Sequence, residues 1–264
     1  MAIQLIVLDL DGTLLTSDKT ITARTKDVLA RAMAHGVTVT IATGRMLRSA
    51  LYFARLIGSD APVVCCNGGY VGGERAEPIF ARCFDPALAR AFLTFCYERS
   101  WYVNWFAGME IYAPEYRPDY FTAYQTTANF TVNAVGDDYL RYTENVPQFV
   151  LCELDHGIGA YVRAVRAHFG KALVPQQNTG TSVDINPPGV NKAVGVQALA
   201  GAMGLTLDEV MVAGDADNDF EMLAMGAFSV VPENGLSAAK ERARYVTASN
   251  DADGIAAAIE KFVL

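Results

Sequence analysis

The sequence has no long hydrophobic run and is poor in basic residues. No stretch of about 18 or more consecutive apolar residues occurs, so we expect no membrane-spanning helix. Lys and Arg number 21 against 29 Asp and Glu, which gives a net charge of −8. Because a nucleic-acid backbone is bound mainly through Lys and Arg, this balance argues against a nucleic-acid partner. An anionic small molecule can still bind where a metal ion corrects the charge locally.

Targeting and disulfide features are missing as well. Residues 1–5 lead straight into a strand-like segment, without the basic flank and cleavage site of a signal peptide. The cysteine count is odd, and no Cys-x-x-Cys spacing occurs. This usage is typical of free thiols in a reducing compartment, so we expect a cytoplasmic protein. The five cysteines are Cys65, Cys66, Cys83, Cys96 and Cys152.

Strand-like and helix-like segments alternate at both ends of the chain. Apolar residues make up 52% of the sequence, which is enough for a packed core. Alternation of this kind predicts an α/β fold with a doubly wound parallel sheet. The expected strands are residues 3–8, 37–41, 62–65, 209–213, 228–231 and 245–247. The expected helices are residues 22–35, 47–54, 193–203, 220–225 and 237–242, with a last helix that ends at Leu264.

The middle of the chain differs, because aromatic residues gather there between Trp101 and Tyr124. We interpret residues 81–183 as an inserted α+β domain, with strands near 148–154 and 171–175 and a helix near 160–169. Residues 1–80 and 184–264 then form one discontinuous core domain. The aromatic side chains fit packing on a small sheet and contact with a substrate, and both interpretations stay open.

Two carboxylates directly follow the first expected strand. Asp9 and Asp11 stand two residues apart, so both side chains can point the same way from the strand end. Ligands of open α/β sheets bind at the carboxyl ends of the strands, which is where these residues lie. Gly12 allows a sharp turn that brings its N–H close to an anion. Ordinary capped turns carry the same pattern, so this fragment alone does not define a site.

A second polar turn follows the strand at 37–41. Thr43 offers a hydroxyl donor and Gly44 an unhindered N–H at a helix start, and both groups suit a phosphate oxygen. Taken alone, this turn is as common in structural roles as in functional ones. The position of the turn is what makes it informative about a site, because the second strand of a parallel sheet ends at the same edge as the first.

An acidic cluster follows the strand at 209–213, in the run Gly214-Asp215-Ala216-Asp217-Asn218-Asp219. A calcium loop is one interpretation, but Met222 and Leu223 follow and the closing Glu is missing. A magnesium site needs only one or two carboxylates with substrate and water, which fits better.

Lys192 precedes the helix that leads to this strand. A single lysine there is usually a solvated charge. Successive strand ends or helix starts carry an acid pair, a Thr, a Lys and an acid cluster. It is improbable that this combination arose by chance. The set predicts one phosphate-handling site.

These motifs resemble those of the haloacid-dehalogenase superfamily of phosphohydrolases, and more narrowly its Cof-type branch, which carries a large α/β cap. The matching residues are Asp9-Leu10-Asp11-Gly12-Thr13, Thr43-Gly44-Arg45, Lys192, and Gly214-Asp215 with Asn218-Asp219. The resemblance covers about residues 1–80 and 184–264, and it implies a Rossmann-like core with an inserted cap. Two places depart from the family pattern: Ala193, where Gly is usual, and residues 231–235.

The resemblance implies a magnesium-dependent phosphatase for a small phosphorylated metabolite. Asp9 would attack phosphorus and form an aspartyl-phosphate, while Asp11 would protonate the leaving oxygen and then activate water. The side chain of Asp9, the backbone carbonyl of Asp11 and Asp215 would hold Mg²⁺. Thr43 and Lys192 would bind and neutralise the transferring oxygens.

Four further residues receive roles from the same resemblance. Gly12, Gly44 and Asn218 would bind the phosphate, and Asp219 would orient Lys192 from behind. Sugar phosphates, pyridoxal phosphate and flavin mononucleotide are all substrates typical of the family, and the sequence does not choose among them. We expect a monomer or a small homo-oligomer.

Other functions use similar residues. A signalling receiver module also carries a phosphoryl group on a parallel sheet, but it would need neither Asp11 as proton shuttle nor an insertion of this length. A phosphosugar mutase of the same fold would return the phosphate to substrate. A non-catalytic phosphoryl-binding protein would not require both Asp9 and Asp11. A NAD-binding fold is disfavoured, since no Gly-x-Gly-x-x-Gly follows the first strand.

Overall fold

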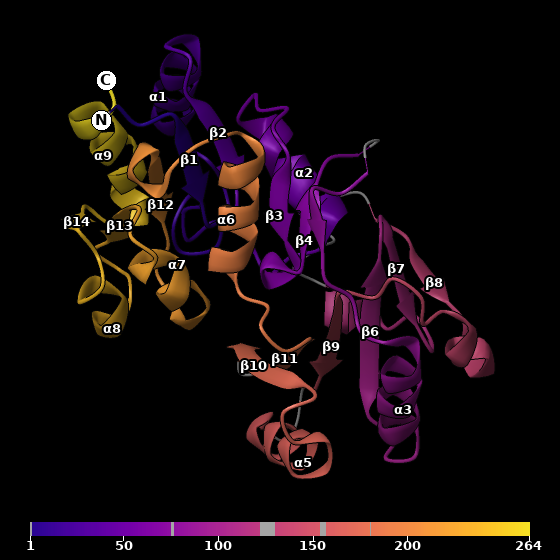
Figure 1. Cartoon of the computed structure of the whole chain (residues 1–264). Coiled ribbons are helices and arrows are strands. Elements are labelled where there is room, and N and C mark those ends of the chain that lie inside the picture. The colour runs from indigo at the N-terminus through magenta and orange to yellow at the C-terminus, as the bar shows by residue number, and fades with distance from the viewer. Residues whose placement is uncertain (1, 75–76, 122–129, 154–156, 180) are drawn as a thin grey trace. The chain divides into compact units, whose positions relative to one another are not determined.

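The computed structural model describes residues 2–74, 77–121, 130–153, 157–179 and 181–264. The chain forms two compact units (Figure 1). Unit 1 comprises Met1–Arg45, Ala50–Phe80 and Asn191–Leu264, and unit 2 comprises Met46–Ser49 and Ala81–Val190. The expected domain division at residue 183 stays a prediction. In the structure this position lies within strand β11 (Ser182–Asn186), and unit 2 continues to Val190.

Unit 1 contains a five-stranded sheet in which every pair of neighbours is parallel. The strand order is β14-β13-β12-β1-β2. All four residues of β1 are buried, as expected for a parallel strand that is covered on both faces. The strands are β1 (Leu5–Leu8), β2 (Thr38–Ile41), β12 (Val210–Ala213), β13 (Phe228–Pro232) and β14 (Tyr245–Thr247).

Helices cover both faces of this sheet. Helices α1 and α9 contact one another, and α6 lies over the sheet (Figure 1). Side chains of α6 and α7 pack against Leu5, Val7, Val210 and Val212. The helices of unit 1, with α2 shared between the units, are α1 (Ala23–Ala34), α2 (Leu47–Leu56), α6 (Lys192–Ala202), α7 (Phe220–Ala224), α8 (Ser237–Lys240) and α9 (Gly254–Phe262). The predicted doubly wound α/β core is thus confirmed.

Local sequence explains where the principal helices begin and end. Thr22 caps α1 by accepting a hydrogen bond from the backbone N–H of Thr25, and Gly36 follows the helix end with a φ of 84°. Asn191 caps α6 in the same way by accepting from the N–H of Val194 at 3.0 Å. The cap on α6 fixes the position of Lys192, its first residue.

Strand β3 (Val63–Cys65) departs from the expected pattern. It pairs antiparallel with β4 (Tyr70–Gly72) in a three-stranded sheet whose third strand is β5 (Phe80–Ala81), and an isolated parallel bridge connects Val64 to Ala42, just after β2. Pro62, which precedes β3, has no N–H to donate to a ladder, and its carbonyl accepts a hydrogen bond from the Thr40 hydroxyl at 2.6 Å.

Unit 2 is built on a six-stranded mixed sheet of order β10-β11-β9-β6-β7-β8. Its strands are β6 (Tyr102–Ala107), β7 (Glu110–Ala113), β8 (Val132–Ala134), β9 (Gln148–Cys152), β10 (Val174–Thr179) and β11. Helices α3 (Pro86–Tyr97) and α5 (Gly159–Phe169) pack on one face of it, around Trp105 and Phe149. The predicted α+β insertion is confirmed.

Two details of the predicted insertion are wrong or untested. The strand expected at 171–175 begins only at Val174, because Gly170 with a φ of 56° ends α5 and a turn follows. The aromatic residues near Trp101 mostly pack together; the Trp101 ring, for example, lies 4.2 Å from that of Tyr161. Tyr124 lies outside the described residues.

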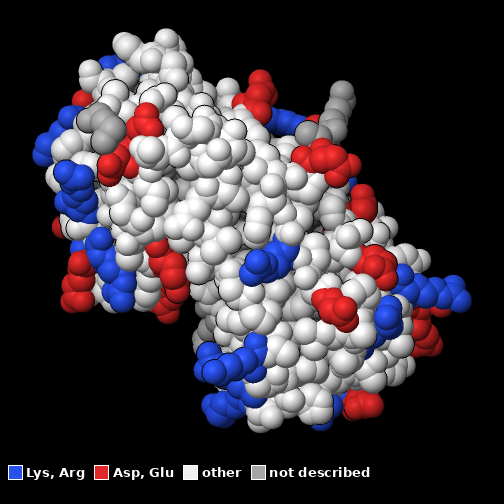
Figure 2. Space-filling view, viewed as in Figure 1, with Lys and Arg blue, Asp and Glu red and all other residues white. Residues whose placement is uncertain are grey.

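The surface in view carries both signs of charge in scattered groups (Figure 2). The part of unit 1 over α6 is nearly free of charge, since no charged residue follows Lys192 in that helix. Within the described parts of the chain, the helices are too short or too polar to span a bilayer.

Candidate active site

The ends of β1 and β12 place two carboxylates side by side. Leu8 and Ala213 are register partners, and the N–H of Asp9 donates to the carbonyl of Ala213 at 2.9 Å. Asp9 and Asp215 therefore leave the same edge of the sheet. One carboxylate oxygen each from Asp9, Asp215 and Asp219 lies within 4.8 Å of the others.

Lys192 joins two of these acids. Its ammonium donates to Asp9 Oδ1 at 2.6 Å and to Asp219 Oδ1 at 2.7 Å, and its side chain is fully buried. Burial alone would lower the pKa of Lys192, but the charges of Asp219 and Asp9 outweigh it and raise that pKa. The lysine thus stays a cation in the interior of the site.

Asp219 fixes the loop as well as the lysine. Its second oxygen accepts the backbone N–H groups of Asp215 and Ala216, at 2.9 and 3.1 Å. A Cβ on Gly214 would lie 2.4 Å from the carboxyl carbon of Asp219, so only glycine leaves room for this turn. Asp219 therefore couples the position of Lys192 to that of Asp215.

The side chain of Asp215 packs closely against the backbone of Gly12. Its Oδ1 accepts the Thr13 hydroxyl at 2.7 Å, and its pKa is raised to about 6, chiefly by burial. Gly12 has a φ of 87°, and a Cβ there would lie 2.4 Å from Asp215 Oδ2. Asn234, from the loop that departs from the family pattern, donates to the Gly12 carbonyl at 2.7 Å and supports this turn.

Asp11 is held by two cations. Arg45 donates from Nε to Oδ2 and from Nη2 to Oδ1, both at 2.8 Å, and Lys19 donates to Oδ1 at 2.9 Å. Burial opposes ionisation, but the hydrogen bonds and charges of Arg45, followed by those of Lys19, lower the pKa of Asp11 to about 2. Sequence reasoning gave Arg45 no role, although it stands in a recognised motif.

Thr43 and Asn218 are linked through Asn67, which belongs to the region of family resemblance but to which sequence reasoning gave no role. Thr43 is buried. Its N–H donates to the Val64 carbonyl at 3.0 Å, and its own carbonyl accepts the N–H of Asn67 at 3.1 Å. Asn67, with a φ of 53°, accepts from Asn218 Nδ2 at 3.3 Å. The side-chain hydroxyl of Thr43 accepts the N–H of Arg45, two residues on and just past Gly44, at 3.2 Å.

The residues present fit a small divalent cation with oxygen ligands. Asp9 and Asp215 supply two carboxylates, which is what Mg²⁺ requires of a protein, while Asp219 is engaged by Lys192 and the loop. Burial, with Asp219 and Asp215 nearby, raises the pKa of Asp9 against the pull of Lys192. A bound cation would relieve this crowding of negative charge.

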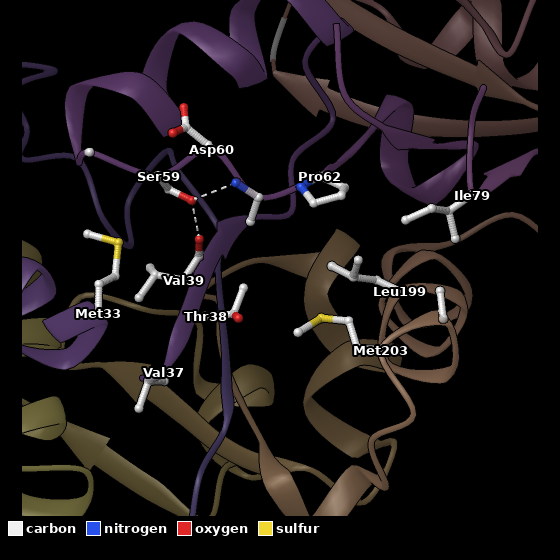
Figure 3. Close-up of a pocket in the computed structure, with 13 residues that line it drawn as sticks. Met33, Val37, Thr38, Val39, Ser59, Asp60, Pro62, Ile79, Leu199 and Met203 are labelled. Carbon is white, nitrogen blue, oxygen red and sulfur yellow. Dashed lines mark hydrogen bonds between the residues drawn. The ribbon is translucent and has the colours of Figure 1, made fainter. Parts of the chain in front are cut away.

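A separate cavity of about 450 Å³ lies at the start of β2, whereas Thr43 follows its end (Figure 3). Its walls include Met33, Leu199 and Met203, and the Ser59 hydroxyl there donates to the Val39 carbonyl. None of the acids or the lysine described above lines it. The cavity is therefore not the place where these residues act.

The chain belongs to the haloacid dehalogenase-like hydrolases, whose family model matches residues 6–259. It is 30% identical to the 5-amino-6-(5-phospho-D-ribitylamino)uracil phosphatase YitU of Bacillus subtilis, over 98% of this chain and 97% of the relative. It is 29% identical to the pyridoxal phosphate phosphatase YbhA of Escherichia coli, over 97% of each chain. The chain is thus a phosphatase of the Cof-type branch, and the predicted family and enzyme class are confirmed.

A solved structure has the same fold as this chain. The crystal structure of a haloacid dehalogenase-like hydrolase from Bacteroides thetaiotaomicron superposes with a TM-score of 0.89. The match covers 98% of this chain and 99% of the other, at 23% identity. At this identity the likeness defines the fold and does not extend to the substrate.

Proposed function

We propose that the protein is a magnesium-dependent phosphatase that forms an aspartyl-phosphate on Asp9 and hydrolyses a small phosphorylated metabolite. The observation that carries the proposal is the buried contact of Lys192 with Asp9, next to Asp215 at the same sheet edge. The two curated relatives named above act on small phosphorylated compounds, which supports a substrate of that class.

The main electrostatic problem is the approach of one anion to another. A carboxylate about 4 Å from a phosphate charge is repelled by roughly 4 kcal/mol per charge pair at an effective dielectric of about 20. Lys192 lies 2.6 Å from Asp9 and opposes this repulsion from within the protein. Mg²⁺ held by Asp9, Asp215 and the Asp11 carbonyl would neutralise further charge on the phosphate.

Asp9 is the proposed nucleophile because it combines burial with a fixed orientation. Its Oδ1 is bound by Lys192, and its backbone is tied to β12 through Ala213. Attack on phosphorus forms the Asp9–phosphate bond and breaks the bond from phosphorus to the leaving oxygen. Attack of water on phosphorus then releases phosphate and restores the carboxylate.

Asp11 is the proposed acid and base for these two steps. Arg45 binds both of its oxygens and favours the ionised carboxylate, so the pair must weaken before Asp11 can carry a proton to the leaving oxygen. The phosphate of a substrate competes for the same guanidinium, because guanidinium groups bind phosphate and carboxylate in the same forked geometry. Thr43, Gly44, Gly12 and Asn218 remain the proposed phosphate contacts.

A phosphate-release screen over a panel of phosphorylated metabolites, with and without Mg²⁺, tests the proposal. We expect release for at least one metabolite, dependent on Mg²⁺ and lost in Asp9→Asn. Phosphate transferred to a second substrate position without release would favour a mutase. No release from any member of the panel at saturating Mg²⁺ contradicts the proposal.

A further inference from the structure

Three consecutive residues after β3 have a left-handed backbone. Cys66, Asn67 and Gly68 have φ values of 51°, 53° and 89°. Glycine adopts this conformation freely and Asn tolerates it, but for Cys it is strained. Such a backbone persists only where the surrounding structure enforces it. All three residues are buried in unit 1, so the contacts that enforce this turn lie inside the protein.

The backbone of the turn holds the loop that carries Thr43. The N–H of Cys66 donates to the carbonyl of Arg45 at 3.0 Å, and the N–H of Asn67 donates to the carbonyl of Thr43 at 3.1 Å. The N–H of Thr43 donates to the carbonyl of Val64 in β3, at 3.0 Å. These three hydrogen bonds fix both ends of the loop.

The start of α6 also packs against the turn. A Cβ on Gly68 would lie 2.1 Å from the carbonyl oxygen of Asn191 and 3.1 Å from the Cα of Lys192, so only glycine fits at this position. Asn191 caps the helix, and Lys192 is its first residue. The turn therefore lies directly against the backbone that carries the lysine of the site.

The side chain of Asn67 reaches a third part of the site. Its Oδ1 accepts a hydrogen bond from Nδ2 of Asn218 at 3.3 Å, and Asn67 is 2% exposed. Asn218 is half-buried in the segment that follows β12. Asn67 thus contacts two of the proposed phosphate contacts, Thr43 through its backbone and Asn218 through its side chain.

We propose that Asn67 is a positioning residue of the phosphate site, which orients the amide of Asn218 and holds Thr43 in place. The inference rests on the proposed function, in which both of these residues bind the phosphate. Asparagine suits the position because it tolerates the left-handed backbone and still offers a carbonyl oxygen to the Asn218 amide. Glycine would fit the backbone but could not orient that amide.

Asn67→Gly separates the two roles, because glycine keeps the left-handed backbone and its N–H and removes only the side-chain amide. Calorimetry measures the binding of inorganic phosphate to the full-length protein in saturating Mg²⁺. We expect the Kd for phosphate to rise about fivefold or more, as for one lost buried hydrogen bond, and kcat/KM to fall by a similar factor. The Mg²⁺ concentration for half-maximal phosphate release should not change, because Asp9 and Asp215 are untouched.

Asn145→Gly is the matched control. Asn145 has a φ of 55° and is exposed in unit 2. The same substitution there makes the same change to a left-handed backbone, and it should leave phosphate binding and turnover as they are. The melting temperature should change little in both variants, because glycine fits both backbones.

A double-mutant cycle with Asn218→Ala tests whether Asn67 acts through Asn218. If it does, Asn67→Gly should weaken phosphate binding by less than about twofold in a protein that already carries Asn218→Ala. Unchanged phosphate binding in Asn67→Gly overturns the inference. Equal losses with and without Asn218→Ala also overturn it.

Failure of the proposed function would look different. A wild type that binds inorganic phosphate but releases it from no metabolite contradicts that function, and the binding measurements then decide the inference without turnover. An active wild type whose phosphate binding and kinetics are unaffected by Asn67→Gly overturns the inference alone. A wild type that neither turns over a phosphate ester nor binds inorganic phosphate overturns both.

Discussion

Lys192 is the residue on which the charge balance of the site depends. It lies between Asp9 and Asp219 with no exposed surface, and it is the only ammonium bonded to either acid within the described residues. Two buried carboxylates without this cation would repel each other in an environment that screens charge poorly. We therefore expect the lysine to contribute to stability as well as to the proposed chemistry.

Lys192→Met should destabilise the protein by about 3–5 kcal/mol, the range found when one partner of a buried ion pair is removed. Denaturant unfolding measures the change. Lys26→Met, at an exposed position of α1, is the control and should leave stability nearly unchanged. A loss no larger than that of the control would mean that the buried ion pair does not stabilise the fold.

Asp215 and Asp217 offer a matched pair of acids in one loop. Asp215 is partly buried beside Gly12, whereas Asp217 is exposed. Asp215→Asn should raise the Mg²⁺ concentration for half-maximal phosphate release at least about tenfold, because one of two carboxylate ligands is lost. Asp217→Asn should leave that concentration unchanged. Equal effects of the two substitutions would place the metal elsewhere.

At the scale of elements, the site depends on which strands end at one edge. The sequence predicts β1, β2 and β12 well, because each is a short, largely apolar or β-branched run with polar or acidic residues within two positions of its end, and parallel strands carry such residues to one edge. That reasoning brings Asp9 and Asp215 close together, whereas Lys192 enters the predicted site as the start of a helix and through the family resemblance.

Other parts of the site could not be predicted in this way. The bidentate pair of Arg45 with Asp11 depends on side-chain directions across two turns, which residue spacing does not define. The contact of Asn234 with Gly12 joins residues more than 200 positions apart, in a loop that differs from the family pattern. The antiparallel pairing of β3 with β4 depends on the tight turn at Cys66–Gly68, so the alternating pattern did not indicate it.

The turn after β1 offers a test at this scale. Gly12 and Gly36 have similar φ values, 87° and 84°, but a Cβ would collide with Asp215 only at Gly12. Alanine at Gly36 should cost about 1–2 kcal/mol of stability because of the left-handed backbone, and alanine at Gly12 should cost more because of the added collision. Phosphate release should fall at least about a hundredfold in Gly12→Ala alone. Similar activity in both variants would show that the space beside Asp215 is not needed.

At the scale of the whole molecule, acids outnumber bases, and three of them cluster in one buried place. Binding a divalent cation there should stabilise the folded state, because a ligand that binds only the native protein shifts the unfolding equilibrium. At an Mg²⁺ concentration of about 100 times the Kd, the gain is about 2.7 kcal/mol.

Thermal unfolding with Mg²⁺ and with a chelator measures this effect. The melting temperature should rise with Mg²⁺ concentration in the wild type and in Asp217→Asn, and much less in Asp215→Asn. Phosphate release should stop on chelation and return when Mg²⁺ is added back. A melting temperature that does not respond to Mg²⁺, with full activity in the chelator, would show that the protein neither binds nor requires the metal.

The central claim is that phosphate passes through Asp9, and the covalent enzyme can be trapped. Turnover is quenched with borohydride, which reduces an aspartyl-phosphate to homoserine, and the peptides are then analysed by mass spectrometry. We predict homoserine at position 9 in the wild type with substrate, and none in Asp9→Asn. Turnover with an unmodified Asp9, or a trapped phosphoryl group on another residue, would contradict the account.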